Sequence, residues 1–180
     1  MLALKINITK FINQEERDRI FKYSKSLAEC YNLALNELKT NNDFNAIHPI
    51  TKQFQNEHKE IYSKHAQNCG RDAISAVKSF FKLRKVEPTA KYPKHNRKYS
   101  TITLDANKQT RILKSDETVT NLGGGFKFIA DKVIKFTYPQ MLLDLSSCKY
   151  FNSTKINKES IKQIILKTEY SRTNLCKFCL

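Results

Sequence analysis

The chain has 180 residues, 40% of them hydrophobic and 27% charged, a composition typical of a globular protein rather than a disordered one. Its 32 Lys and Arg against 17 Asp and Glu give a net charge of +15 and a pI near 9.6, which favours nucleic acid as a partner. It has no run of about 18 apolar residues and no N-terminal signal peptide, so we expect a cytoplasmic protein with no membrane contact.

The start of the sequence predicts one strand followed by a long helix. In residues 2–9, apolar and polar residues alternate, which is typical of a half-buried strand. Asn13 precedes Glu16 by three residues, the spacing of a helix N-cap and its acidic partner. Apolar residues then recur at intervals of three and four over a helix of about 14–39. These residues are Ile20, Tyr23, Leu27, Tyr31, Ala34 and Leu38.

Two further helices are predicted, over about 49–60 and about 62–85. Pro49 suits the first turn of the earlier helix, where its missing N–H needs no partner. Gly70 weakens the later helix by roughly 1 kcal/mol relative to Ala, and Pro88 ends helical structure. The apolar face of the later helix comprises Ala66, Cys69, Ala73, Val77, Phe80 and Phe81.

After residue 98 the pattern changes to short alternating segments, which predict antiparallel strands. Gly123, Gly124 and Gly125 supply a turn or bulge between two of them. We expect residues 139–160 to form an uneven loop and residues 171–180 to form an irregular tail. The predicted strands are 99–104, 111–114, 126–130, 133–138 and 161–170.

One strand followed by three helices and then by several strands is the element order of an α+β protein. A lone first strand would leave an unpaired edge, so we expect it to pair with the later strands. Residues 1–9 and 99–170 then form a small antiparallel β-barrel, which is split by an inserted three-helix domain at residues 10–90. Within that insertion, residues 10–60 are helix-turn-helix-like, and the basic connector 82–98 returns the chain to the barrel.

The densest charge lies in the basic connector, KLRKVEPTAKYPKHNRK, which has one acid, Glu87. A positive segment between ordered elements suits a polyanion, because each neutralised phosphate releases condensed counterions. The alternative is a solvated basic loop. Tyr92 and Tyr99 are candidates for base stacking. Phe80 and Phe81 lie side by side and cannot both point the same way from a helix, so at least one is expected in the core.

The Cys, His and acidic residues build no persuasive metal or catalytic site. Five scattered cysteines, an odd number, favour reduced thiols over a disulfide framework. Cys176 and Cys179 form a CxxC pair without two further zinc ligands in suitable positions. His65 and Cys69 lie one helical turn apart and could share a metal, yet no third ligand is evident. The sequence has no P-loop and no nucleophile elbow, so we expect no metal, no cofactor and no catalytic residue.

Short segments along residues 2–170 share their order and spacing with a known family. They are LKINIT at 4–9, CYNLAL at 30–35, AQN at 66–68, Ala73 and Val77 with KSFFK at 78–82, and YPK at 92–94 leading to YSTIT at 99–103. Together they resemble the N-terminal half of the transposon-encoded OrfB/TnpB family, the insertion-sequence relatives of type V CRISPR effectors.

The resemblance implies a wedge domain of oligonucleotide-binding type, split by a helical recognition domain. It implies a role in RNA-guided DNA cleavage, with a guide RNA and target DNA as partners. By the same resemblance, Gln67 and Asn68 contact the short DNA motif beside the target. Residues 78–98 line the path of the guide and heteroduplex, where backbone charge matters more than base identity. The residues expected to bind nucleic acid are Lys78, Lys82, Arg84, Lys85, Lys91, Tyr92, Lys94, Arg97, Lys98 and Tyr99.

The chain departs from this family because full members continue into a RuvC-type nuclease domain with acidic metal ligands. No Asp or Glu here inherits a catalytic role, so we expect a protein that binds nucleic acid without cutting it. The segment 171–180 would then be a frameshifted tail. Two alternatives stay open: a stand-alone helix-turn-helix DNA-binding regulator, and one half of a nuclease whose catalytic half is a separately encoded polypeptide.

Overall fold

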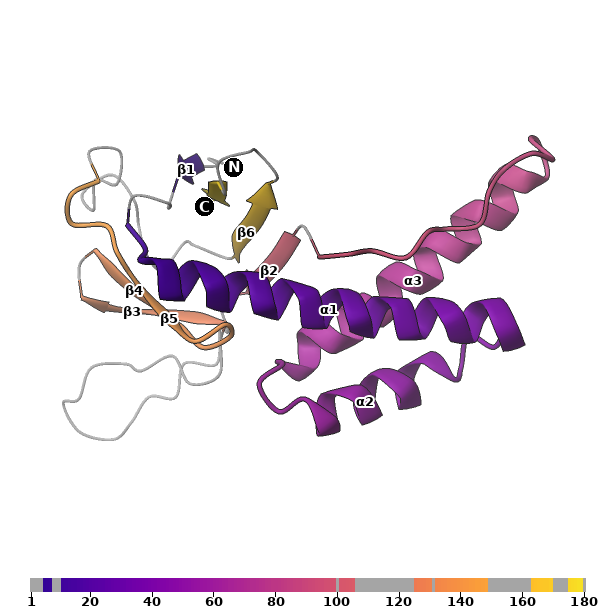
Figure 1. Cartoon of the computed structure of the whole chain (residues 1–180), viewed down its shortest axis with the longest axis horizontal. Helices are drawn as coiled ribbons and strands as arrows, with labels where there is room; N and C mark the ends of the chain where they lie inside the picture. Colours follow the sequence, from indigo (N-terminus) through magenta and orange to yellow (C-terminus); the bar gives the residue numbers. More distant parts are fainter. Residues whose placement is uncertain are drawn as a thin grey trace, which may run out of the picture. The chain divides into compact units, whose positions relative to one another are not determined.

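The computed structural model describes residues 5–7, 11–99, 101–105, 125–130, 132–148, 163–169 and 175–179 (Figure 1). Within these ranges the chain forms three helices and seven strands. In chain order they are β1 Lys5–Asn7, α1 Gln14–Asn41, α2 Ile47–Glu57, α3 Ser63–Arg84, β2 Thr101–Asp105, β3 Phe126–Ala130, β4 Val133–Phe136, β5 Met141–Asp144, β6 Gln163–Glu169 and β7 Leu175–Cys179.

Internal contacts divide the chain into two compact units. Unit 1 comprises Met1–Ile20 and Ser100–Leu180, and it contains the strands and the first turns of α1. Unit 2 comprises Phe21–Tyr99, and it contains the rest of α1 together with α2 and α3. Strand β1 pairs antiparallel with β7, so the expected pairing of the first strand with the later strands is confirmed.

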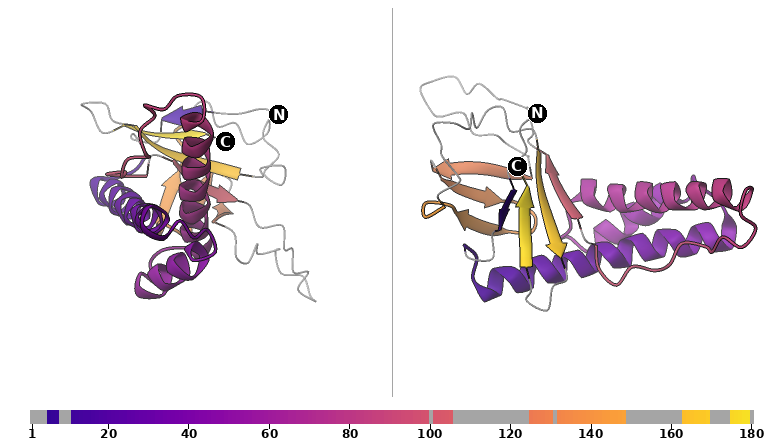
Figure 2. Two further views of the ribbon diagram at one scale, coloured as in Figure 1. Left: turned by 90° about the vertical axis from the view of Figure 1, so that its right-hand side faces the viewer. Right: turned by 90° about the horizontal axis from the view of Figure 1, so that it is seen from above.

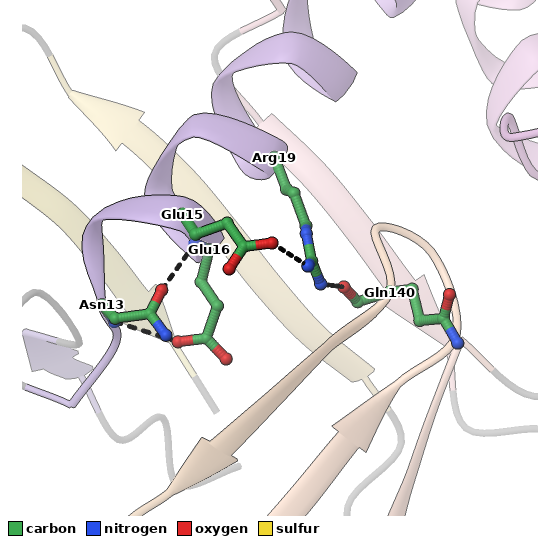
Figure 3. A network of polar contacts seen from close by, with 5 residues as sticks. All are labelled: Asn13, Glu15, Glu16, Arg19 and Gln140. Carbon is green, nitrogen blue, oxygen red and sulfur yellow. Dashed lines mark hydrogen bonds and ion pairs between the residues drawn. The ribbon is translucent and has the colours of Figure 1, made fainter.

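Helix α1 begins at a reciprocal capping box, as predicted (Figure 3). The Glu16 N–H donates to Asn13 Oδ1 at 2.8 Å, and the Asn13 N–H donates to Glu16 Oε2 at 3.0 Å. Two N–H groups that the first helical turn leaves without partners are thereby satisfied. Within the same unit, Arg19 pairs with Glu15 and donates to the Gln140 carbonyl at 3.4 Å, so the start of α1 is tied to the β4–β5 hairpin.

The helices bury the faces that the sequence predicts. All six apolar residues predicted for one face of α1, from Ile20 to Leu38, are buried, and all but Ile20 belong to unit 2. On α3 the apolar face from Ala66 to Phe80 is buried, but Phe81 is 41% exposed. This division confirms the expectation that at least one of the two adjacent phenylalanines belongs to the core.

Gly70 lies at a close contact between α2 and α3. A Cβ atom on this residue would lie 2.9 Å from both Ile47 Cγ2 and Thr51 Cγ2, and both of these side chains are buried. The glycine that weakens α3 as an isolated helix therefore allows α2 to pack against it. Tertiary contact compensates here for low helix propensity.

The strands of unit 1 form two open antiparallel sheets. One has the order β1-β7-β6-β2 and the other the order β3-β4-β5. The predicted closed β-barrel is wrong for the described strands, because neither sheet pairs its two edges. The alternation of apolar and polar residues along a strand indicates which face of the strand is buried. Closure of a sheet into a barrel depends instead on the tilt and stagger between strands, and the alternation does not specify these.

Two segments predicted to be irregular are strands. In β5, Met141 and Leu143 are buried while Leu142 and Asp144 are exposed; the run Met-Leu-Leu hides this alternation in the sequence. Residues 175–179 form β7, which lies between β1 and β6 and corrects the expected irregular tail. A central strand is held by backbone hydrogen bonds on both edges, so it needs no clear side-chain pattern. The strand predicted at 111–114 lies outside the described residues.

Candidate nucleic-acid interface

The outward face of α3 carries a row of polar and cationic side chains. Their spacing of three and four residues places them on one helical face, opposite the buried face of the same helix. The row contains no acidic residue. We call it the α3 stripe; it consists of Lys64, Gln67, Asn68, Arg71, Ser75, Lys78 and Lys82, all exposed except the half-buried Asn68.

Two cations of the α3 stripe, Arg71 and Lys78, contact uncharged side chains that leave their charge in place. Lys78 Nζ lies 5.2 Å from the centre of the Phe44 ring, a cation–π contact. An Arg71 guanidinium N–H donates to Asn68 Oδ1 at 3.5 Å, which aligns two members of the α3 stripe. Between described residues, no carboxylate pairs with Arg71, Lys78 or Lys82. Their charge is therefore available to an external anion.

Most of the basic connector is anchored along α1. Helix α3 ends at Arg84, so the first three connector residues belong to the helix. Residues 85–99, here called the return segment, run back beside α1 in the opposite chain direction (Figure 2, right). Asn32 bonds to Asn96 twice, donating to its carbonyl at 2.8 Å and accepting from its N–H at 2.8 Å. His95 Nε2 lies 2.7 Å from Asn36 Oδ1.

The far end of the return segment is fixed at Tyr99. Its N–H donates to the Ser24 carbonyl at 3.0 Å, while the Ser24 hydroxyl donates to the Tyr99 carbonyl at 2.5 Å. These backbone ties argue against the alternative of a free solvated loop. Lys85, Lys91, Lys94 and Arg97 are exposed, whereas Lys98 is half-buried and has partners within the protein.

The two tyrosines predicted to stack on bases take part in internal packing. The Tyr92 ring meets Phe80 edge to face, with centroids 5.1 Å apart, and its hydroxyl donates to the Leu35 carbonyl at 3.5 Å. The Tyr99 hydroxyl donates to the Asp72 carboxylate, and its ring lies 6.3 Å from that of Tyr31. Both side chains are half-buried, so the structure gives them a role in anchoring the return segment.

Gln67 and Asn68, the two residues carried over from the family, lie within the α3 stripe. Gln67 is exposed, and Asn68 accepts the hydrogen bond from Arg71 described above. Amide side chains flanked by cations can read a base edge while the cations hold phosphates. Gln67 and Asn68 share one helical face with the cations of the α3 stripe.

Lys64 and Arg71 are members of this face that the sequence analysis did not select. Both lie outside the dense positive run 82–98. The available signal was their helical spacing with Lys78 and Lys82, opposite the apolar residues. The number of charges in a stretch of sequence does not indicate which helical face carries them, whereas the spacing of the charges does.

His65 and Cys69 belong to the core of unit 2. The Tyr23 hydroxyl lies 2.8 Å from His65 Nδ1 and accepts the Tyr62 N–H at 3.1 Å. Cys30, Cys69 and Cys148 are free and buried. Across the part of the chain that is described, no three His, Cys, Asp or Glu side chains gather as metal ligands would.

No known family, curated protein or solved structure matches this chain. Among the described residues, no helix has the length and apolar character needed to cross a membrane.

Proposed function

We propose that this chain binds nucleic acid through the α3 stripe and the adjoining return segment. The observation that carries the proposal is the row of outward cations and amides on α3, from which acidic residues are missing. From Lys64 to Lys82 the row extends about 27 Å at 1.5 Å per residue. That length matches roughly eight successive phosphates at about 3.4 Å each along one strand.

The resemblance to the OrfB/TnpB family supports a more specific proposal. The described order of β1, three helices and later strands agrees with a wedge domain split by a recognition domain. We propose that the partners are a guide RNA and the DNA that it targets, with Gln67 and Asn68 contacting the motif beside the target. In this proposal the chain holds nucleic acid and a different polypeptide or domain performs any cleavage.

The salt dependence of binding tests the role of the α3 stripe. We expect the Arg71→Ala, Lys78→Ala, Lys82→Ala triple variant to bind RNA and DNA more weakly, with a slope of log K against log salt shallower by about 0.7–0.9 per lost phosphate contact. The matched control is Lys39→Ala, Lys52→Ala, Lys59→Ala, which removes the same charge from exposed positions on α1, on α2 and beyond α2. Equal slopes for the two variants would show that only net charge matters.

A second measurement addresses motif recognition. In a binding selection on random duplexes, Gln67→Ala should change the preferred sequence, because a base-edge contact is lost. Gln53→Ala, which alters an exposed glutamine on α2, should leave the preference unchanged. An unchanged preference for Gln67→Ala would remove Gln67 from the reading site.

A stand-alone DNA-binding regulator is the second candidate. It is favoured by the close packing of α2 against α3 at Gly70, since a helix pair of this kind can place its second helix in the major groove. Preference for duplex DNA over structured RNA at about 150 mM salt would support the regulator. The opposite preference would support the RNA-guided proposal. Cleavage of DNA by this chain alone on adding magnesium would contradict both.

A further inference from the structure

Three aromatic rings form a continuous row at the C-terminal end of α3. Tyr92 meets Phe80 edge to face, and the Phe80 and Phe81 centroids lie 5.3 Å apart. The Arg84 guanidinium lies 5.6 Å from the centre of Phe80. Phe80, in the middle of the row, is 7% exposed, whereas Phe81 is 41% exposed, so the row reaches the surface of unit 2 at Phe81.

The surroundings of Phe81 are positively charged. Lys78 precedes it by one helical turn, Lys85 follows it by one turn, and Lys82 is its neighbour in sequence. No acidic residue lies within five positions of Phe81 on either side. An exposed aromatic ring that is backed by a buried ring and surrounded by cations combines a flat apolar surface with nearby phosphate-binding groups.

We infer that Phe81 is a stacking platform for an unpaired base at the end of the α3 stripe. The inference rests on the proposed nucleic-acid binding and extends it to single-stranded segments. It transfers the stacking role from the half-buried Tyr92, whose ring meets Phe80 edge to face, to the exposed Phe81. Stacking on an aromatic ring is tolerant of sequence because every base has a flat face.

A fluorescence experiment tests this directly, since the chain contains no tryptophan. In the full-length Phe81→Trp variant, the new indole should be quenched saturably by a thymidine dodecamer. An abasic strand with the same number of phosphates should cause little quenching. The matched control is Phe21→Trp, because Phe21 is 39% exposed in the same unit and lies 5.0 Å from Lys25 Nζ. Equal quenching of both variants would overturn the inference.

Affinity gives a second, independent readout. Phe81→Ala should weaken binding of the dodecamer by about fivefold or more, and Phe81→Tyr should restore it, because stacking needs an aromatic face. Phe21→Ala should bind like the unaltered protein. If Phe81→Ala also binds like the unaltered protein, the platform is refuted while nucleic-acid binding stands. If the unaltered protein binds neither RNA nor DNA, the proposed function itself fails.

An anionic bilayer is the competing occupant, because Leu83 and Val86 are also exposed near these cations. Vesicles containing phosphatidylserine serve as the probe. A blue shift of the Phe81→Trp emission with vesicles, without quenching by the dodecamer, would assign the tip of α3 to a lipid surface and overturn the inference. Quenching by the dodecamer without a vesicle-induced shift would support it.

Discussion

Tyr99 joins the return segment to α3 because its hydroxyl donates to the Asp72 carboxylate. Burial is the main cause that raises the pKa of its phenol above the ordinary value near 10.0, and the nearby Cys69 and Asp72 raise it further. The pKa of the Cys69 thiol is raised as well, chiefly through its hydrogen bond with Cys30 and through burial. Both groups are therefore neutral at physiological pH, and Cys69 is a packing residue rather than a nucleophile.

This raised pKa predicts how stability depends on alkaline pH. The unfolded phenol loses its proton near pH 10 while the folded one keeps it, so the free energy of unfolding falls as pH rises above about 10. Tyr99→Phe removes this contribution and should give a shallower decline in urea unfolding measured between about pH 9 and pH 11. Identical declines in the two proteins would show that Tyr99 titrates alike in both states.

Asn32 holds the return segment near its C-terminal end, through its two bonds to Asn96. We expect Asn32→Ala to lower the free energy of unfolding by about 1 kcal/mol, because both backbone groups of Asn96 lose their partner. The Asn96 amide should also exchange faster with deuterium. Asn56→Ala, at an exposed position on α2, should change neither quantity. Unaltered exchange at Asn96 in the Asn32 variant would contradict the proposed anchor.

At the scale of elements, α3 serves two structural roles on opposite faces. Its inner face packs in unit 2 and meets α2 at Gly70, and its outer face carries the α3 stripe. The packing of the inner face determines the rotation of the helix about its axis. A small change in how α2 and α3 meet would therefore redirect every cation on the outer face together.

Gly70→Ala tests this contact. Helix propensity alone predicts a gain of about 1 kcal/mol, but overpacking a close contact costs about 1–3 kcal/mol. We expect net destabilisation in urea unfolding, because the added methyl would lie 2.9 Å from the buried Ile47 and Thr51 side chains. Ser79→Ala, at an exposed position on the same helix, should be neutral or slightly stabilising. Stabilisation by Gly70→Ala would mean that α2 and α3 separate readily.

At the scale of the whole molecule, both units carry a positive net charge. Residues 21–99 hold fifteen Lys and Arg against seven Asp and Glu, and the remaining residues hold seventeen against ten. Within unit 1, strands from the two ends of the chain pair with each other, since β7 lies between β1 and β6. Integrity of the four-stranded sheet therefore depends on both ends of the sequence.

Removing residues 171–180 tests that dependence. Without β7, β1 loses its described partner and β6 retains only β2. We expect amide protection in β6 to fall while the buried segments of α1 and α3 in unit 2 stay protected, as measured by hydrogen–deuterium exchange. Unchanged protection of β6 would show that the pairing with β7 contributes little and would return 171–180 to an irregular tail.

The helices and their buried faces could be predicted because their signals are local. Ile20 to Leu38 follow a period of three and four, and Asn13 with Glu16 forms a cap within one turn. The strands were predicted less well. Met141 to Asp144 lack a visible alternation, and the pairing of β7 depends on backbone groups that are remote in sequence. Which of Tyr92 and Phe81 packs internally and which is exposed depends on side chains from other segments, so the sequence pattern did not show it.

The sequence by itself determined the α+β class, the three helices, the insertion between strands and the positive character of the chain. Periodicity, capping and net charge are properties of residues near one another in the chain, so they can be read without coordinates. Only the tertiary structure decided that the sheets are open, that the basic connector is anchored to α1, and that Phe81 rather than Tyr92 is exposed. Burial and edge pairing depend on contacts between residues far apart in sequence, and local patterns do not specify them.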